Sequence, residues 1–425
     1  MKLVVSVFLV ALALASAEFQ RSLEGSKVYN VFPETDPHFT LLSSLEQIVD
    51  GVDFWQRAHV LGREARILVP QASQAVFESV LENAGISWTI LINDVEITLE
   101  NERHVNEIAR LTAHKDGRIS FTAYHRHAAI NTYLDGLATQ YPSKVRVRTL
   151  GKSGEGRDLK AIIISTTGGT GTKPVIVVDA GIHAREWAAP ALALYMITKL
   201  VEEITESDIV NNIDWVIVPL INPDGYEYSQ SSTANRLWRK TRSTVSSTSC
   251  PGVDGNRNFD FQWMVSGSSS SPCSDIFAGP RAFSEPETQY LRDLLVEYKA
   301  RAKAYLAIHS YGSYFLYPYG YNGRPTPDNT EINALGVRVG AAIDAASLAG
   351  STKYLVGNSG AALNYLASGA SDDYAYGVGG VKLSYTLELP GGGNNGFDLP
   401  PARISQVVRE SWQGIVVLAR YVLAN

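Results

Sequence analysis

The chain has 425 residues, 45% of them hydrophobic, and a formal net charge of −6. Its length and apolar content allow more than one folding unit with a sizeable core. The 37 basic residues are scattered along the chain, so no cluster of Lys and Arg forms a surface that would follow a phosphate backbone. We therefore expect no nucleic-acid partner.

The N-terminus has the features of a secretory signal peptide. Lys2 precedes an apolar stretch, residues 3–14, and the small residues Ala15, Ser16 and Ala17 follow. This stretch is shorter than the roughly 20 apolar residues that span a bilayer. We predict a signal peptide over residues 1–17, a secreted, extracellular protein and no membrane association. The sequence contains no Asn-x-Ser/Thr sequon, so we expect no N-glycosylation.

Residues 18–118 mix helix and strand patterns and lack the glycine density of the rest of the chain. They end in a polar segment that contains Arg110, Lys115 and Arg118. Exposed basic residues between two compact units are sites that a trypsin-like protease cuts, although an ordinary linker would have the same composition. We predict a small α+β domain over residues 18–118 and a larger domain over residues 119–425.

From about residue 119 onward, short runs rich in Val, Ile and Tyr alternate with amphipathic stretches. This pattern predicts an α/β domain with a mixed, largely parallel twisted sheet flanked by helices. Strands are predicted at 159–166, 174–181, 214–222, 302–310 and 382–389. Helices are predicted at 188–203, 285–300 and 403–423. Ser284 and Glu287 predict a capping box around Pro286 at the start of the second helix.

The chain has two cysteines, Cys250 and Cys273. In a secreted protein with no third thiol to compete, one disulfide between them is the expected arrangement, and two buried free thiols are the alternative. A single bridge in so long a chain also indicates that the fold is stabilised mainly by its core.

Polar residues follow four of the predicted strands at their carboxyl ends, where open α/β sheets bind ligands. They are His183 with Glu186, Asn222 with Asp224, His309, and Glu388. His183 and Glu186 have side chains that Zn²⁺ accepts, but this short pattern is weak alone, since a catalytic zinc site needs three protein ligands. His309 is the best third candidate, with a core histidine as the alternative. Glu388 is either a partner in a structural ion pair or a general base.

Five motifs in order carry a resemblance to a known family. They are "GIHAREW" (181–187), "NRLWRKTR" (235–242), "DGNRNF" (254–259), "HSYGSYFLYPYG" (309–320) and "SYTLEL" (384–389). Together they resemble the zinc metallocarboxypeptidases of the pancreatic A and B type, over a segment from about 120 to 425. The two cysteines also stand where that family has a disulfide, and residues 18–118 look like its activation domain.

The resemblance implies a secreted zymogen of an exopeptidase that hydrolyses the C-terminal peptide bond and holds one Zn²⁺ per chain. It implies roles for eleven residues. The ligands would be His183, Glu186 and His309; Glu388 would be the general base on the zinc-bound water, and Arg239 would stabilise the oxyanion. Asn256, Arg257 and Tyr365 would hold the substrate's terminal carboxylate, Arg257 with a bidentate fork, and Arg185 and Arg236 match further substrate-side positions. The eleventh, Asp372, concerns specificity.

Asp372 stands where the family selects the C-terminal side chain. An aspartate there implies a preference for Lys or Arg, since a basic side chain supplies the partner that a carboxylate in a partly dehydrated pocket needs. Gly360 leaves room for a long side chain and agrees with the B type. Gly320 disagrees, because the B type usually has serine there. The segment 368–382 is also one residue longer than the mammalian pattern and has Tyr374 where Trp is frequent. The A-type preference for aromatic and aliphatic ends is the alternative.

The expected partners are peptide or protein C-termini as substrates, an activating trypsin-like protease and proteinaceous carboxypeptidase inhibitors. We expect a monomer. A nucleotide-binding protein or a serine hydrolase is disfavoured, because the phosphate-loop-like "GKSGEG" (151–156) has Arg146 where the first glycine is required and no G-x-S-x-G motif occurs. A non-enzymatic binding module would require a missing ligand, base or arginine, and none is missing.

Overall fold

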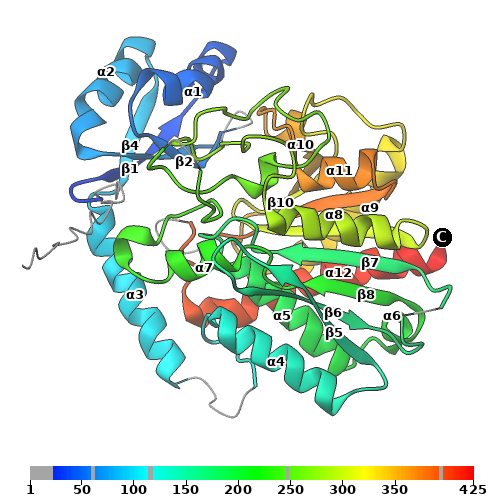
Figure 1. The fold of residues 1–425 in the computed structure, drawn as a ribbon. Helices are drawn as coiled ribbons and strands as arrows, with labels where there is room; N and C mark the ends of the chain where they lie inside the picture. Colours follow the sequence, from blue (N-terminus) through cyan, green and yellow to red (C-terminus); the bar gives the residue numbers. More distant parts are fainter. Residues whose placement is uncertain (1–22, 59–62, 113–117, 170, 246–247, 392–395) are drawn as a thin grey trace, which may run out of the picture.

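The computed structural model describes residues 23–425 except 59–62, 113–117, 170, 246–247 and 392–395. The predicted signal peptide therefore lies outside the described residues, as do Lys115 and most of the glycine-rich stretch 391–396. The described chain forms two sheets, a small one at the upper left of Figure 1 and a large one through its middle and right. In the part of the chain that is described, no helix is both long and apolar enough to cross a membrane.

The N-terminal unit contains a four-stranded antiparallel sheet in the order β2-β3-β1-β4. Its strands are β1 (Lys27–Phe32), β2 (Asp53–Gln56), β3 (Ala65–Val69) and β4 (Ser87–Ile92). Helices α1 (Asp36–Ile48) and α2 (Gln74–Ala84) pack their apolar side chains on one face of this sheet. A long helix, α3 (Val95–Thr112), then leads toward the second unit (Figure 1).

The second unit is built on an eight-stranded mixed sheet in the order β11-β10-β12-β9-β7-β8-β6-β5. The four central strands, β12, β9, β7 and β8, run parallel to one another. The strands are β5 (Val145–Lys152), β6 (Asp158–Ile164), β7 (Val175–Ala180), β8 (Asp214–Val218), β9 (Ala302–Ser310), β10 (Tyr314–Tyr317), β11 (Leu355–Asn358) and β12 (Leu383–Leu389). The strands β7 and β8 are buried along their whole length, as expected for parallel strands covered on both faces.

Helices cover both faces of the large sheet. One face packs against a large apolar core supplied by α4 (His127–Gln140), α5 (Ala188–Val201), α6 (Ser207–Asn212), α7 (Pro223–Ser229), α9 (Asn329–Ala346) and α12 (Pro401–Ala424). The other face packs against α8 (Pro286–Tyr298), α11 (Ser371–Gly377) and the long loops between β8 and α8, and the short helix α10 (Ser359–Ala362) follows β11. Cys250 and Cys273 form the predicted disulfide within one of these loops.

The predicted α/β fold class is confirmed. The five predicted strands correspond to β6, β7, β8, β9 and β12, and the three predicted helices to α5, α8 and α12. The capping box at α8 is wrong. The helix begins with Pro286 after Glu285, which makes no side-chain cap, and the hydroxyl of Ser284 donates to the Glu285 carboxylate instead.

The two units contact each other through an apolar cluster. Val28, Trp55 and Leu68 of the small sheet share this cluster with Tyr311 and Phe397 of the large unit. The rings of Trp55 and Phe397 lie 6.2 Å apart, and those of Tyr311 and Phe397 lie 5.0 Å apart. The free face of the small sheet is thus packed on the end of the large sheet where its strand β9 terminates.

Candidate metal centre

The strand β7 ends in a sharp turn that delivers His183 and Glu186. Gly181 has φ of 72°, and a Cβ atom there would lie 2.9 Å from Leu220 Cδ1 and 3.0 Å from Pro190 Cγ. Glycine therefore fits both the backbone conformation and the available space. The turn leads directly into α5, so His183 and Glu186 are held between two buried elements.

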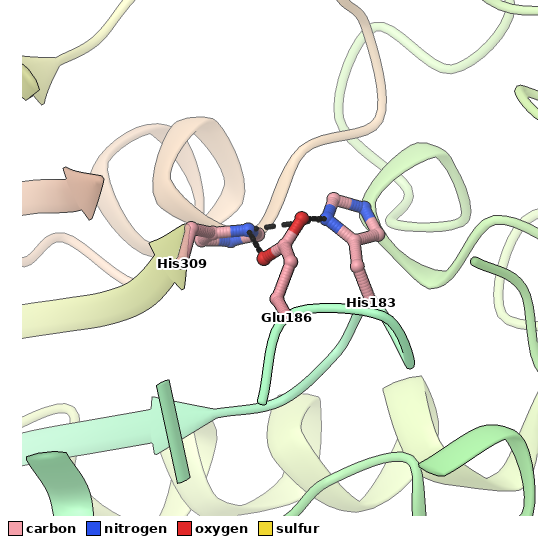
Figure 2. Close-up of side chains that lie close together, drawn as sticks. All are labelled: His183, Glu186 and His309. Carbon is pink, nitrogen blue, oxygen red and sulfur yellow. Dashed lines mark hydrogen bonds and ion pairs between the residues drawn. The ribbon is translucent and has the colours of Figure 1, made fainter. Parts of the chain in front are cut away.

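His309 is the second-last residue of β9, and it lies opposite Glu388 of β12 in the parallel register. The polar residues predicted from different parts of the sequence therefore meet at one edge of the sheet. Figure 2 shows His183, Glu186 and His309 pointing toward one another from β9 and from the turn after β7.

Three potential ligand atoms converge in this cluster, all within 4.8 Å of one another. The Nδ1 atom of His183 lies 2.7 Å from Glu186 Oε1 and 3.2 Å from His309 Nδ1, and His309 Nδ1 lies 3.1 Å from Glu186 Oε2. The three residues are between 1% and 4% exposed. Two imidazoles and one carboxylate with converging atoms fit the donor set of a catalytic zinc site.

The surroundings of the two imidazoles shift their pKa values in opposite directions. Burial, reinforced by Arg239, lowers the pKa of His183 and favours its neutral, metal-binding form. Burial alone would also lower the pKa of His309, but the Glu186 carboxylate outweighs it and raises the pKa to about 9. A bound metal ion would take the place of that proton.

Asp254 holds the far side of the cluster, and sequence reasoning assigned it no role. Its Oδ1 atom lies 3.1 Å from His183 Nε2, and its Oδ2 atom accepts hydrogen bonds from Arg239 at 3.0 and 3.2 Å. A carboxylate on the second nitrogen fixes the orientation of a ligand histidine. The sequence did offer a signal for Asp254, because it is the first residue of "DGNRNF", the motif that also contains Asn256 and Arg257.

Glu388 lies beside this cluster, and its buried Oε2 atom has no hydrogen-bond partner among the described residues. Burial raises the pKa of Glu388 to about 8, with His309 and Arg239 opposing and Glu186 adding to the rise. No structural ion pair holds the described carboxylate, which favours a chemical role over a structural one.

A cavity of about 210 Å³ adjoins the cluster and brings most of the predicted site residues together. Its lining includes the three candidate ligands, Glu388, and six further predicted residues: Arg185, Arg239, Asn256, Arg257, Tyr365 and Asp372. Arg236 does not line the cavity in the part of the chain that the structure describes. Residues of β2 close the opposite side of the same cavity, so it lies between the two units.

The longer segment before Glu388 leaves Asp372 inside the cavity. Asp372 lies near the start of α11, is buried, and has Ser359 Oγ 3.4 Å from its Oδ2 atom. Burial raises the pKa of this carboxyl group. Tyr374 lies in the core, where it contacts the rings of Phe259 and Phe283. A tyrosine in place of tryptophan at this position therefore changes how α11 packs on the core.

Gly360 has a second reason to be glycine besides the room it leaves for a substrate. A Cβ atom there would lie 2.6 Å from the Cα atom of Gly323 and 2.9 Å from the carbonyl oxygen of Gly320. The close approach of the segment 320–323 thus requires glycine at this position.

Asn222 and Asp224, which follow β8, do not join the candidate metal centre. Asn222 accepts a hydrogen bond from the backbone N–H of Gly225 and caps α7. Asp224 is fully buried and accepts hydrogen bonds from Ser153 Oγ at 2.6 Å and Arg157 Nη1 at 2.7 Å. Both residues stabilise loops.

Two arginines predicted to face the substrate are paired with carboxylates of the N-terminal unit. Arg185 donates to Asp53 of β2 at 2.7 Å, and both side chains are nearly buried. Arg236 donates through Nε to both carboxylate oxygens of Glu102 on α3, at 2.8 and 2.9 Å. The Arg185–Asp53 pair therefore lies in the wall of the cavity, whereas the Arg236–Glu102 pair joins the two units outside the cavity lining.

Comparison with known proteins gives a family for both units. The model of the family "Zinc carboxypeptidase" matches residues 130–414, and the model "Carboxypeptidase activation peptide" matches residues 29–102. The chain belongs to the zinc carboxypeptidase family. The N-terminal unit is its activation domain, and the protein is the zymogen of a carboxypeptidase. Zinc is accordingly its cofactor, and the His-Glu-His cluster is able to hold one ion.

Three relatives illustrate the similarity. The chain is 42% identical to carboxypeptidase B of Helicoverpa zea over 97% of this chain and 98% of that one. It resembles the crystal structure of carboxypeptidase A from Helicoverpa armigera, with 38% identity, a TM-score of 0.89 and coverage of 95% and 98%. It also resembles bovine thrombin-activatable fibrinolysis inhibitor in complex with tick carboxypeptidase inhibitor, with 32% identity, a TM-score of 0.66 and coverage of 72% and 99%.

Proposed function

We propose that His183, Glu186 and His309 hold the zinc ion of this carboxypeptidase, and that residues 119–425 form the active enzyme. The observation that carries the proposal is the convergence of three buried ligand atoms beside the Glu388 oxygen that has no partner among the described residues. The carboxylate of Asp254 on His183 supports it, because ligand histidines are commonly held in this way.

The residues around the cluster supply the other parts of peptide hydrolysis. A zinc ion held there would supply Lewis-acid chemistry, polarising the scissile carbonyl and acidifying a water molecule. Glu388 takes the proton of the attacking water and passes it to the leaving amine. Arg239, fixed by Asp254, places its guanidinium where the carbonyl oxygen becomes negative.

Asn256, Arg257 and Tyr365 bind the terminal carboxylate of the substrate in this proposal. Arg257 is well fixed, because its Nε donates to the Gly267 carbonyl at 2.8 Å and its Nη1 to the Asn256 carbonyl at 2.9 Å. A fixed guanidinium suits a carboxylate. When the scissile bond is at the metal centre, the terminal carboxylate of a peptide reaches Arg257 only if that bond is the last one of the chain. This arrangement favours removal of single C-terminal residues.

Asp372 gives the enzyme a preference for C-terminal Lys or Arg. A buried carboxylate that lines the cavity needs a positive or hydrogen-bonding partner, which a basic substrate side chain supplies. The competing proposal is an A-type preference for aromatic and aliphatic ends, which Gly320 favours.

Peptides that differ only in a C-terminal Arg, Lys, Phe or Leu separate the two preferences. The processed wild-type enzyme should release Arg and Lys faster, and Asp372→Ile should reverse the order, with kcat/KM as the measure. We expect a change of roughly 100-fold or more, because the variant leaves a substrate cation without its partner. A wild type that prefers Phe, or a variant that still prefers Arg, would contradict the assignment to Asp372.

The ion pairs of Arg185 and Arg236 support latency of the uncut protein. Arg110 and Arg118 are exposed and flank the segment where the two units join. Brief treatment with trypsin should therefore release a fragment close to residues 119–425 and raise activity. Full activity before cleavage would show that the activation domain does not block the site.

We propose secretion on the basis of the N-terminal sequence, residues 1–17, and activation by a trypsin-like protease. The substrates are then extracellular peptides and proteins with a free C-terminus. The similarity to a protein solved with tick carboxypeptidase inhibitor supports the proposal that proteinaceous inhibitors bind the processed enzyme. We retain a monomer as the expected state.

A further inference from the structure

Asp179 is a buried charge in the centre of the large sheet that peptide hydrolysis, as derived above, does not use. It is the second-last residue of β7 and is fully buried. Buried carboxylates are costly unless they are hydrogen-bonded, so each oxygen of Asp179 requires an account. Its Oδ1 atom accepts a hydrogen bond from the hydroxyl of Tyr305 on the neighbouring strand β9. Its Oδ2 atom has no partner among the described residues.

The register of the sheet brings Asp179 close to His309. Asp179 of β7 lies opposite Ala307 of β9, and side chains two residues apart on a strand share one face. Tyr305, Asp179 and His309 therefore lie on the same face of the sheet. Burial raises the pKa of Asp179 to about 6, while the Tyr305 hydroxyl and the His309 imidazole oppose that rise.

Three buried polar atoms in this region have no hydrogen-bond partner among the described residues. They are Asp179 Oδ2, His309 Nε2 and the hydroxyl of Ser371. His309 uses Nδ1 in the metal cluster, so Nε2 is the nitrogen that must carry the hydrogen when the ligand is neutral. Ser371 lies beside Tyr305, and its side chain acts on the Tyr305 hydroxyl as a hydrogen-bonding neighbour, although the two groups are not aligned for a full hydrogen bond. One donor, one anionic acceptor and one hydroxyl are the partners that a buried water molecule typically has.

We propose that Asp179 is a positioning residue for the metal ligand His309, which it holds through one buried water molecule shared with Ser371. This inference rests on the proposed function, because it takes His309 as a zinc ligand. The two histidines are then held differently: His183 by direct contact with Asp254, and His309 by a water-mediated contact with Asp179. Each contact fixes the nitrogen that faces away from the metal.

The test measures zinc affinity on processed enzyme from which the metal has been removed, by competition with a chelator. Asp179→Asn removes the charge at almost constant volume and should weaken zinc binding by about 10- to 100-fold, the usual effect of losing such a partner. Tyr305→Phe keeps the charge but loses the hydrogen bond that orients it, so its loss should be smaller, about 3- to 10-fold. The absorption spectrum of the cobalt-substituted enzyme should change in Asp179→Asn, because the geometry around the metal changes.

Asp214→Asn is the matched control. Asp214 is also fully buried, begins the adjacent parallel strand β8, has one oxygen bound by Arg301 at 2.9 Å, and its Oδ1 atom has no described partner. Asp214 lies at the amino end of β8, whereas the metal cluster lies at the carboxyl ends of the parallel strands β7 and β9. This variant should lower thermal stability and leave zinc affinity within about twofold of the wild type.

The outcomes are distinguishable. If the wild type binds no zinc, the proposed function itself fails. If the wild type binds zinc and Asp179→Asn loses stability like Asp214→Asn without losing zinc affinity, the positioning role is wrong. If Asp179→Asn does not fold, unchanged zinc affinity in Tyr305→Phe overturns the inference. A crystal structure should show a water at about 2.7–3.2 Å from the three atoms, and a dry gap there would overturn the water-mediated contact.

Discussion

Glu388 is the single residue on which the chemistry depends most. It lies next to His309 in the register of β12 and β9, and the described residues leave its buried oxygen free. Glu388→Gln keeps the shape but cannot accept a proton, so kcat should fall by roughly 100- to 10,000-fold, the typical range for a general base. Zinc content, measured by atomic absorption, should remain one per chain. A variant with near-normal kcat would remove Glu388 from the mechanism.

Glu287 is a residue whose charge should affect stability and not catalysis. Burial and the nearby Glu285 carboxylate raise its pKa to about 8, far above the 4.5 of an exposed glutamate. The folded protein therefore keeps a proton that the unfolded chain releases, so this contribution is complete below pH 4.5 and is lost as the pH rises through 8. Glu287→Gln should abolish that loss and be more stable than the wild type at pH 9, by up to about 5 kcal/mol.

The measurement for Glu287 is the free energy of unfolding of the processed enzyme at several pH values from 5 to 9. Glu297→Gln is the control, because Glu297 lies exposed on the same helix α8. Its pH profile should match that of the wild type. Equal slopes for all three proteins would show that Glu287 is not protonated in the fold.

At the scale of elements, β2 and α3 deliver the two carboxylates that occupy Arg185 and Arg236. Replacing one partner of a buried pair leaves an uncompensated charge, which costs about 3–5 kcal/mol. Asp53→Asn and Glu102→Gln should therefore weaken docking of the activation domain. Uncut protein with both substitutions should show basal activity at least roughly tenfold above the uncut wild type.

The assay for these variants uses a short peptide and uncut protein, followed by trypsin. Glu82→Gln, an exposed residue of α2 in the same domain, should leave latency unchanged. After cleavage all the proteins should have equal activity, since the substitutions leave with the activation domain. Unchanged latency in the double variant would mean that the apolar cluster around Trp55 and Phe397 holds the domain alone.

At the scale of the whole molecule, the fold depends on its core more than on its disulfide. Two large apolar clusters cover the two faces of the eight-stranded sheet, whereas one disulfide joins residues 23 apart in the sequence. Removing a disulfide that closes a loop of this size lowers the free energy of unfolding by about 3 kcal/mol. Cys250→Ser with Cys273→Ser should therefore fold, remain active and unfold at a lower temperature in calorimetry. A double variant that does not fold would contradict this view of the core.

The sequence predicted the sheet and the metal cluster because both depend on strong local patterns. Buried parallel strands are continuous apolar runs, and His183, Glu186 and His309 end such runs. The ion pairs between the two units could not be predicted. Asp53 and Glu102 are ordinary acidic residues in their own segments, and their partners lie 132 and 134 positions away. Ser284 and Glu287 satisfied a local capping pattern, but Glu285 competed for the Ser284 hydroxyl.

The most direct test of the account is a zinc titration of the metal-free, trypsin-processed enzyme, with mass spectrometry of the products from two peptides. The peptides share one sequence ending in Arg, one with a free C-terminal carboxylate and one amidated. We predict no cleavage without metal, full activity at one zinc per chain, and release of the terminal Arg from the free-carboxylate peptide alone. Cleavage that is insensitive to zinc, or internal cleavage of the amidated peptide, would contradict a zinc exopeptidase built on His183, Glu186 and His309.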